Sequence, residues 1–227
     1  MPKIELPVLI VNFKIYPQSI GNNALKLAKI MEKVSNEFSA SLIAVPSLPD
    51  LAIISENVDI PVFSQHTDPI ELGANTGHIS AFHLKEIGVS GSLLNHSERR
   101  IKIDHIKQAI EQLNHNTLYS VVCAADPLIS KAVASLEPWA VAMEPPELIG
   151  GDVSVTTKPE IVEETINRIK EASKKVIPLV GAGVKSPAHL EEALRMGSHG
   201  VLLASGITKS KDPETILTKM AKVLINY

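Results

Sequence analysis

Residues 176–206 read VIPLVGAGVKSPAHLEEALRMGSHGVLLASG and contain the structural unit that the rest of the chain repeats. The continuously apolar run Val176–Val180 is followed by a Gly-Ala-Gly turn, a helical segment and a second apolar run, Val201–Ala204. Ser186 is a favoured N-cap residue, and Pro187 fits the first turn of a helix. Apolar runs without alternation are typical of parallel strands covered on both faces. The stretch therefore predicts a strand–helix–strand unit with parallel strands.

The same unit recurs along the whole chain, with no linker or low-complexity segment between repeats. The apolar runs are Val8–Val11, Leu42–Val45, Ile60–Phe63, Val89–Leu94, Leu118–Cys123, Trp139–Met143, Val176–Val180 and Val201–Ala204. Regular alternation with helical segments predicts a parallel sheet with right-handed crossovers, and eight such units can close into a barrel. We predict an α/β fold, a (β/α)8 TIM barrel, as one domain over residues 1–227. A doubly wound open sheet is the structural alternative.

Composition narrows the class of protein. The 227 residues are 44% hydrophobic and 21% charged, and the formal net charge of −3 argues against a nucleic-acid surface. The chain shows no signal peptide and no window near about 18 unbroken apolar residues, so we expect a cytoplasmic protein without membrane contact. We expect no metal site, because no Cys/His cluster is present. The single cysteine, Cys123, is interpreted as a small buried hydrophobe.

The loops that follow the strands line the active-site face of such a barrel. Glu144 directly follows the sixth apolar run, at a dry rim where desolvation raises the pKa of a carboxyl group. A glutamate paired with a lysine is the alternative interpretation. Pro145 and Pro146 follow at once, and an apolar tip with the glycine pair 150–151 comes next. A stiff hinge before such a segment suggests a lid.

Four other strand ends carry residues suited to catalysis or phosphate binding. His96 follows the fourth run and precedes a predicted helical turn, whose N-terminus would hold the imidazole neutral, although a structural histidine is the usual alternative. Asn12 and Lys14 end the first run at alternate positions, so in a strand they point the same way. A lysine that merely ends the strand in solvent is the alternative there. The small-residue turns 181–183 and 204–206 favour phosphate binding over ordinary glycine turns.

Together these segments closely resemble the triosephosphate isomerase family in its compact archaeal-type form. The resemblance spans essentially the whole chain, in the family's order, and rests on Asn12-Phe13-Lys14, Asn95-His96-Ser97-Glu98, residues 144–150 (EPPELIG), Gly181-Ala182-Gly183 and Leu202-Leu203-Ala204-Ser205. It implies interconversion of dihydroxyacetone phosphate and glyceraldehyde 3-phosphate, without a cofactor or a metal.

The resemblance also implies a role for each site residue. Glu144 would move a proton between neighbouring substrate carbons, and His96, as neutral imidazole, would polarise the carbonyl group. Lys14 would supply positive charge, and Asn12 would orient the substrate. Backbone groups at four further positions would hold the phosphate: Ile149, Gly183, Ala204 and Ser205. Glu98 resembles an acidic residue of the family that lies next to the catalytic residues and whose negative charge is balanced by nearby cations.

The resemblance extends to assembly. Residues 73–78 resemble the loop that family members insert into a neighbouring subunit, where Thr76 would approach Asn12 and Lys14. We therefore expect a homodimer or a homotetramer, and a compact barrel of this length with some short helices. The chain departs from the family at Gly151-Asp152, where Thr-Gly is common, and at Arg99-Arg100, which is more basic than in many relatives.

Two other functions fit part of this pattern. Another phosphate-binding barrel, such as a Schiff-base aldolase or a sugar-phosphate isomerase, would use the same glycine turns. The sequence disfavours it, since no buried lysine lies in the middle of a predicted strand. A non-catalytic barrel that serves as a binding protein would predict loss of Glu144, His96 or Lys14, and all three are present.

Overall fold

The computed structural model describes residues 3–145 and 154–227. Its strands are β1 (Val8–Asn12), β2 (Ser41–Val45), β3 (Phe63–Ser64), β4 (Gly91–Leu94), β5 (Tyr119–Ala124), β6 (Ala140–Met143), β7 (Ile177–Gly181) and β8 (Gly200–Leu203). All are parallel and pair in the order β2-β1-β8-β7-β6-β5-β4-β3. A parallel bridge between Ala44 and Val62 joins the two ends of this sheet. The predicted barrel is confirmed, and an open sheet is excluded.

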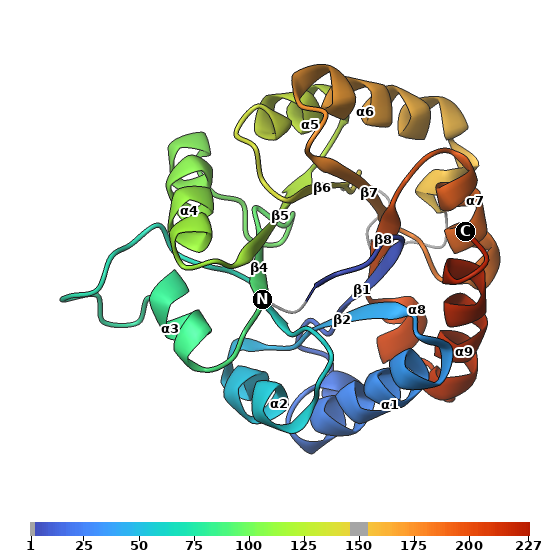
Figure 1. Ribbon diagram of the computed structural model, residues 1–227, viewed down its shortest axis with the longest axis horizontal. Coiled ribbons are helices and arrows are strands. Elements are labelled where there is room, and N and C mark those ends of the chain that lie inside the picture. The colour runs from blue at the N-terminus through green and yellow to red at the C-terminus, as the bar shows by residue number, and fades with distance from the viewer. Residues whose placement is uncertain (1–2, 146–153) are drawn as a thin grey trace.

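Helices surround the ring of strands (Figure 1). They are α1 (Asn22–Phe38), α2 (Leu51–Asn57), α3 (Ala81–Glu86), α4 (Ile103–His115), α5 (Pro127–Ala134), α6 (Pro159–Ala172), α7 (Pro187–Arg195), α8 (Ser205–Thr208) and α9 (Pro213–Leu224), with short 3-10 helices at Pro17–Ser19, Leu48–Asp50 and Val155–Thr157. The side chain of Ser186 caps α7 as predicted, and those of Asp126 and Asp212 cap α5 and α9 in the same way. The expectation of short helices is confirmed by α2 and α3, which have seven and six residues.

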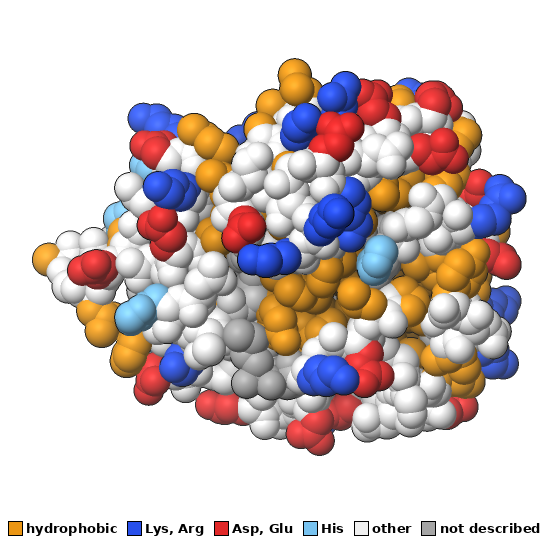
Figure 2. All heavy atoms as spheres, turned by 45° about the horizontal axis from the view of Figure 1, so that its top comes forward, with side chains coloured by type: hydrophobic (Ala, Val, Ile, Leu, Met, Phe, Trp, Pro, Cys, Tyr) orange, Lys and Arg blue, Asp and Glu red, His pale blue; other side chains and the backbone are white. Residues whose placement is uncertain are grey.

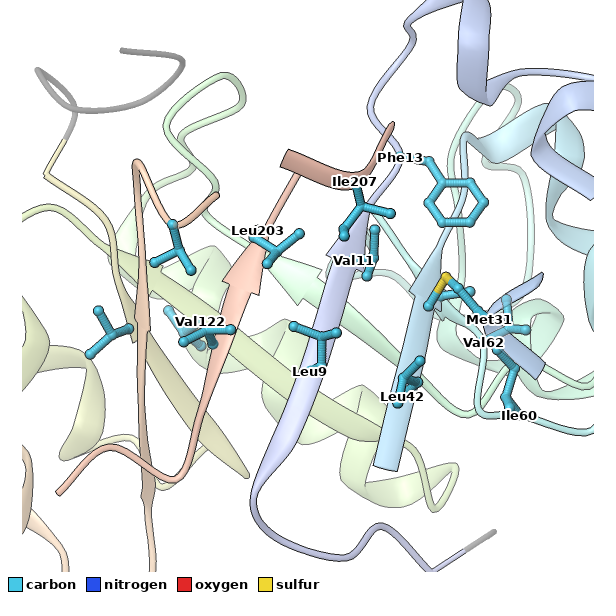
Figure 3. Packing of buried hydrophobic residues seen from close by; sticks show 14 of the residues in the cluster. Leu9, Val11, Phe13, Met31, Leu42, Ile60, Val62, Val122, Leu203 and Ile207 are labelled. Carbon is cyan, nitrogen blue, oxygen red and sulfur yellow. The ribbon is translucent and has the colours of Figure 1, made fainter. Parts of the chain in front are cut away.

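The core has two layers, because alternate residues of each strand point to opposite faces. Val8 and Ile10 of β1 belong to the cluster inside the barrel, whereas Leu9 and Val11 pack in the layer between strands and helices. Figure 3 shows part of this outer layer. Cys123 lies in the inner cluster as predicted, and burial raises the pKa of its thiol well above the ordinary value, which disfavours a reactive thiolate.

The third strand is shorter than predicted. It begins at Phe63 rather than Ile60, and only an isolated bridge at Val62 precedes it. Pro61 explains the difference, because proline has no N–H group to donate to a neighbouring strand. The predicted start of the fourth strand is also two residues early, since β4 begins at Gly91.

The segment between β3 and α3 projects beyond the helices (Figure 1). Its base is closed by two hydrogen bonds of 2.8 Å, in which the N–H of Asp68 donates to the Ile79 carbonyl and the N–H of Ile79 donates to Asp68 Oδ2. Thr76 is exposed on the projection. Acidic and basic side chains are interspersed on the molecular face in Figure 2. In the described part of the chain, no helix is long and apolar enough to cross a membrane.

Candidate active site

A pocket of about 30 Å³ lies where the carboxyl ends of the strands meet. Most of the predicted site residues line it, and these are Asn12, Lys14, His96, Glu144, Gly183, Ala204 and Ser205. Glu98 lies beside the pocket, where it contacts Lys14. Thr76 lies on the projecting loop, away from its own chain's pocket. Ile149 and all of the predicted lid except Pro145, including Gly151 and Asp152, lie outside the described residues.

Glu144 follows β6 directly, and its backbone N–H still donates to the Ala124 carbonyl at 2.8 Å. The side chain is 8% exposed, and its Oε2 has no hydrogen-bond partner among the described residues. Burial raises the pKa of Glu144 above its ordinary value. Nearby His96 and Lys14 and a hydrogen bond with Cys123 offset part of this rise. The structure therefore places a desolvated carboxylate at the pocket, not an exposed surface glutamate.

His96 faces Glu144 across the pocket, with Nε2 3.6 Å from Glu144 Oε2. Its other ring nitrogen, Nδ1, accepts a hydrogen bond of 3.2 Å from the N–H of Glu98. A nitrogen that accepts a hydrogen bond carries no proton, so this arrangement favours neutral imidazole with its proton on Nε2.

The predicted helical turn after His96 is wrong. Residues 97–98 form a simple turn, closed by a 2.7 Å hydrogen bond from the Arg99 N–H to the His96 carbonyl, and α4 begins only at Ile103. The N–H group that contacts the His96 ring therefore belongs to Glu98 in a turn, and not to the N-terminus of a helix.

Asn12 and Lys14 both reach the pocket, but the predicted reason is wrong. The strand β1 ends at Asn12, and Lys14 has a left-handed backbone with φ +53°, so strand alternation does not orient it. The side chain Oδ1 of Asn12 accepts the Lys14 N–H at 3.0 Å and supports that unusual turn. The Lys14 side chain is 9% exposed and its Nζ lies 2.7 Å from Glu98 Oε1, while the Glu98 side chain is 57% exposed. The cation is thus fixed at the pocket rather than free in solvent.

The loops after the neighbouring strands β7 and β8 form another wall of the pocket. Ala182 and Gly183 both have left-handed backbones, with φ of +64° and +71°. The small-residue segment predicted as a turn at 204–206 instead leads into the short helix α8. A Cβ on Gly206 would lie 2.7 Å from Cα of Lys185, so glycine is needed for the two loops to approach each other. Backbone groups of both loops consequently border the pocket.

Sequence reasoning missed several residues of the site. Gln65 Nε2 donates to Asn12 Oδ1 and to the Lys14 carbonyl, both at 3.2 Å, and so ties β3 to the first loop. Gln65 directly follows a strand, so a search for polar residues at strand ends could have found it. Tyr16 and Lys185 also line the pocket, and nothing in their local sequence indicated this.

Residues 7–222 match the triosephosphate isomerase family. Over 223 residues the chain is 44% identical to the triosephosphate isomerase of Caldivirga maquilingensis, covering 98% of this chain and 99% of that protein. It is 44% identical to the enzyme of the same name from Methanothermus fervidus over 218 residues, with coverage of 96% and 98%. The fold resembles the crystal structure of triosephosphate isomerase from Bartonella henselae, with a TM-score of 0.76, 16% identity and coverage of 96% and 98%. The chain therefore belongs to the triosephosphate isomerase family.

Proposed function

We propose that this chain interconverts dihydroxyacetone phosphate and glyceraldehyde 3-phosphate, with Glu144 as the base. Family membership supports the reaction. The observation that carries the assignment of residues is the position of buried Glu144 Oε2, which lies 3.6 Å from the ring nitrogen of His96 in a pocket that Lys14 also lines. This oxygen has no hydrogen-bond partner in the part of the chain that the structure describes. A base and a hydrogen-bond donor on the same small pocket suit proton transfer next to a carbonyl group.

In this mechanism Glu144 takes a proton from the carbon next to the carbonyl group and returns it to the neighbouring carbon. Its raised pKa brings the base closer to neutral pH, where proton transfer in both directions is efficient. The Nε2–H of His96 donates to the carbonyl oxygen as negative charge develops there, and then passes protons between the two oxygens of the enediolate. Lys14 stabilises that charge, and Asn12 supports Lys14 and orients the substrate.

The substrate's phosphate is assigned to the wall formed by the loops after β7 and β8. Gly183, Ala204 and Ser205 line the pocket, and the loop after β8 lies beside the first strand, because β8 pairs with β1. Backbone N–H groups of such loops can approach an anion. The resemblance adds Ile149 and a lid over residues 145–152 that would keep water from the intermediate. No cofactor or metal takes part in this proposal.

We also propose that the chain works in the cytoplasm as a homodimer or a homotetramer. The projecting loop that carries Thr76 supports self-association, because it extends away from its own barrel and ends in exposed residues. In this assembly Thr76 would support the neighbouring subunit's first loop.

The alternative of a Schiff-base aldolase loses further support, because none of the eight strands contains a lysine. Lys14 lies beyond the end of β1, and its Nζ contacts Glu98 Oε1 at 2.7 Å. A binding protein without activity would not need a buried carboxylate oxygen that has no hydrogen-bond partner among the described residues and faces a histidine.

The proposed function is tested by a coupled assay with glyceraldehyde 3-phosphate on the purified chain and on Glu144→Gln. We expect Glu144→Gln to lose about three orders of magnitude in kcat, because the amide cannot accept the proton. Glu164→Gln is the matched control, since Glu164 forms an exposed pair with Arg168 on α6, and it should turn over like the unmodified chain. Equal turnover by Glu144→Gln and the control would refute the assignment.

A further inference from the structure

We infer that Gly181, the last residue of β7, is a positioning residue for Glu144. The lack of a side chain at this position leaves the space that the glutamate side chain occupies when it faces His96. The inference rests on the proposed function, because it gives Gly181 a role only through the base.

The geometry points to the Glu144 side chain as the nearest described obstacle to a side chain at position 181. A Cβ built on Gly181 would lie 2.5 Å from Cγ of Glu144, 2.8 Å from Oε1 and 2.9 Å from Cδ, and these are the three nearest heavy atoms. Gly181 is not among the residues with positive φ, so its backbone is open to alanine. The conflict is therefore between two side chains, not between a side chain and its own backbone.

The two residues are held together by the barrel. Met143 pairs with Val180 in the ladder between β6 and β7, so Glu144 and Gly181 are the next residues along two hydrogen-bonded strands. The Glu144 backbone is further fixed by its hydrogen bond to the Ala124 carbonyl on β5. Because both backbones are fixed, an added methyl group must be accommodated by movement of the Glu144 side chain.

The glutamate side chain has space into which it can move. Glu144 also borders a second cavity of about 260 Å³, which Asn95, Ser97 and Cys123 help to line. A methyl group at position 181 would thus displace the carboxylate without unfolding the barrel. The phosphate wall at Gly183 and Ser205 is a separate part of the pocket and would keep its contacts.

The test is steady-state kinetics of Gly181→Ala. We expect kcat to fall about 100-fold, since a displacement of about 1 Å in a reacting group has this effect. KM should change less than about threefold, because the loss affects the transition state and not phosphate binding. Gly91→Ala is the matched control: a Cβ there would meet Phe63 and the Tyr119 carbonyl at 2.7 Å, an equal degree of crowding outside the pocket. The control should lower stability and leave kcat of the folded enzyme unchanged.

Glu144→Ala, alone and combined with Gly181→Ala, completes the cycle, because it removes all three overlapping atoms. In urea unfolding, any loss of stability caused by Gly181→Ala should vanish in the Glu144→Ala background. If Gly181→Ala does not fold but the double variant does, the inference stands; if neither folds, it is overturned. Unchanged kcat in folded Gly181→Ala also overturns it while leaving the proposed function intact. Full activity in Glu144→Ala would instead refute the proposed function.

Discussion

Nε2 of His96 lies 3.6 Å from Oε2 of Glu144, although the two residues follow strands that are separated in the barrel by β5. The hydrogen bond from the Glu98 N–H to His96 Nδ1 leaves the ring proton on the nitrogen that faces the glutamate. The carboxyl group of Glu144 and Nε2 of His96 therefore border the same pocket, as the proposed proton transfer requires.

Replacement of the donor should lower turnover more than binding. We expect His96→Gln to reduce kcat by about 10²–10⁴, because the amide keeps a donor but cannot relay a proton between two oxygens. Steady-state kinetics with glyceraldehyde 3-phosphate measures this change. His115→Gln is the control, since His115 is exposed at the end of α4. A normal kcat in His96→Gln would exclude the proposed proton relay.

Burial of Glu144 should make the folded protein less stable above the ordinary pKa of a glutamate. The folded-state pKa is raised, so the folded chain holds a proton that the unfolded chain releases, and stability falls as pH rises from the unfolded toward the folded value. We expect Glu144→Gln to raise the urea midpoint at pH 8 and to lose this advantage at pH 4. Stabilisation by the same amount at both pH values would contradict the burial argument.

Replacement of Lys14 should lower activity more than replacement of its partner Glu98. We expect Lys14→Met to lower kcat/KM by about 10²–10³, because a buried cation at the pocket is removed. Glu98→Gln should cost less than about tenfold, since Glu98 is 57% exposed and solvent screens its charge. Kinetics of the two variants decides the point, and a larger loss in Glu98→Gln than in Lys14→Met would reverse our assignment.

The proposed assembly depends on the loop that carries Thr76. We expect Thr76→Glu to elute later in gel filtration and to lose at least about tenfold in activity, because a charge would be buried at the interface. Thr76→Ser is the matched control and should keep both properties. Full assembly together with full activity in Thr76→Glu would remove the inter-subunit role.

Strand positions could be predicted because both faces of each parallel strand are covered, which makes the apolar runs continuous. The short third strand was harder to predict, since Pro61 interrupts its ladder while its apolar pattern continues. The pocket residues could be predicted because they follow strands, and Gln65 fits this criterion too. The role of Gly181 could not be predicted, because it depends on a distance across two strands.

The hydrogen bonding of His96 could not be predicted from the sequence either. Its position after a strand indicated the pocket, but its Nδ1 accepts a hydrogen bond from the Glu98 N–H in a short turn and does not lie at a helix N-terminus. Backbone geometry of this kind depends on how residues 97–102 cross the barrel rim, which local residue preferences do not determine.

The proposed function depends on exchange of a carbon-bound substrate proton by Glu144. Dihydroxyacetone phosphate incubated in D2O and followed by proton NMR measures this exchange directly. We predict that the unmodified chain incorporates solvent deuterium next to the carbonyl group, and that Glu144→Gln does so slower by at least about 10³. Deuterium incorporation by Glu144→Gln at the rate of the unmodified chain would contradict the account.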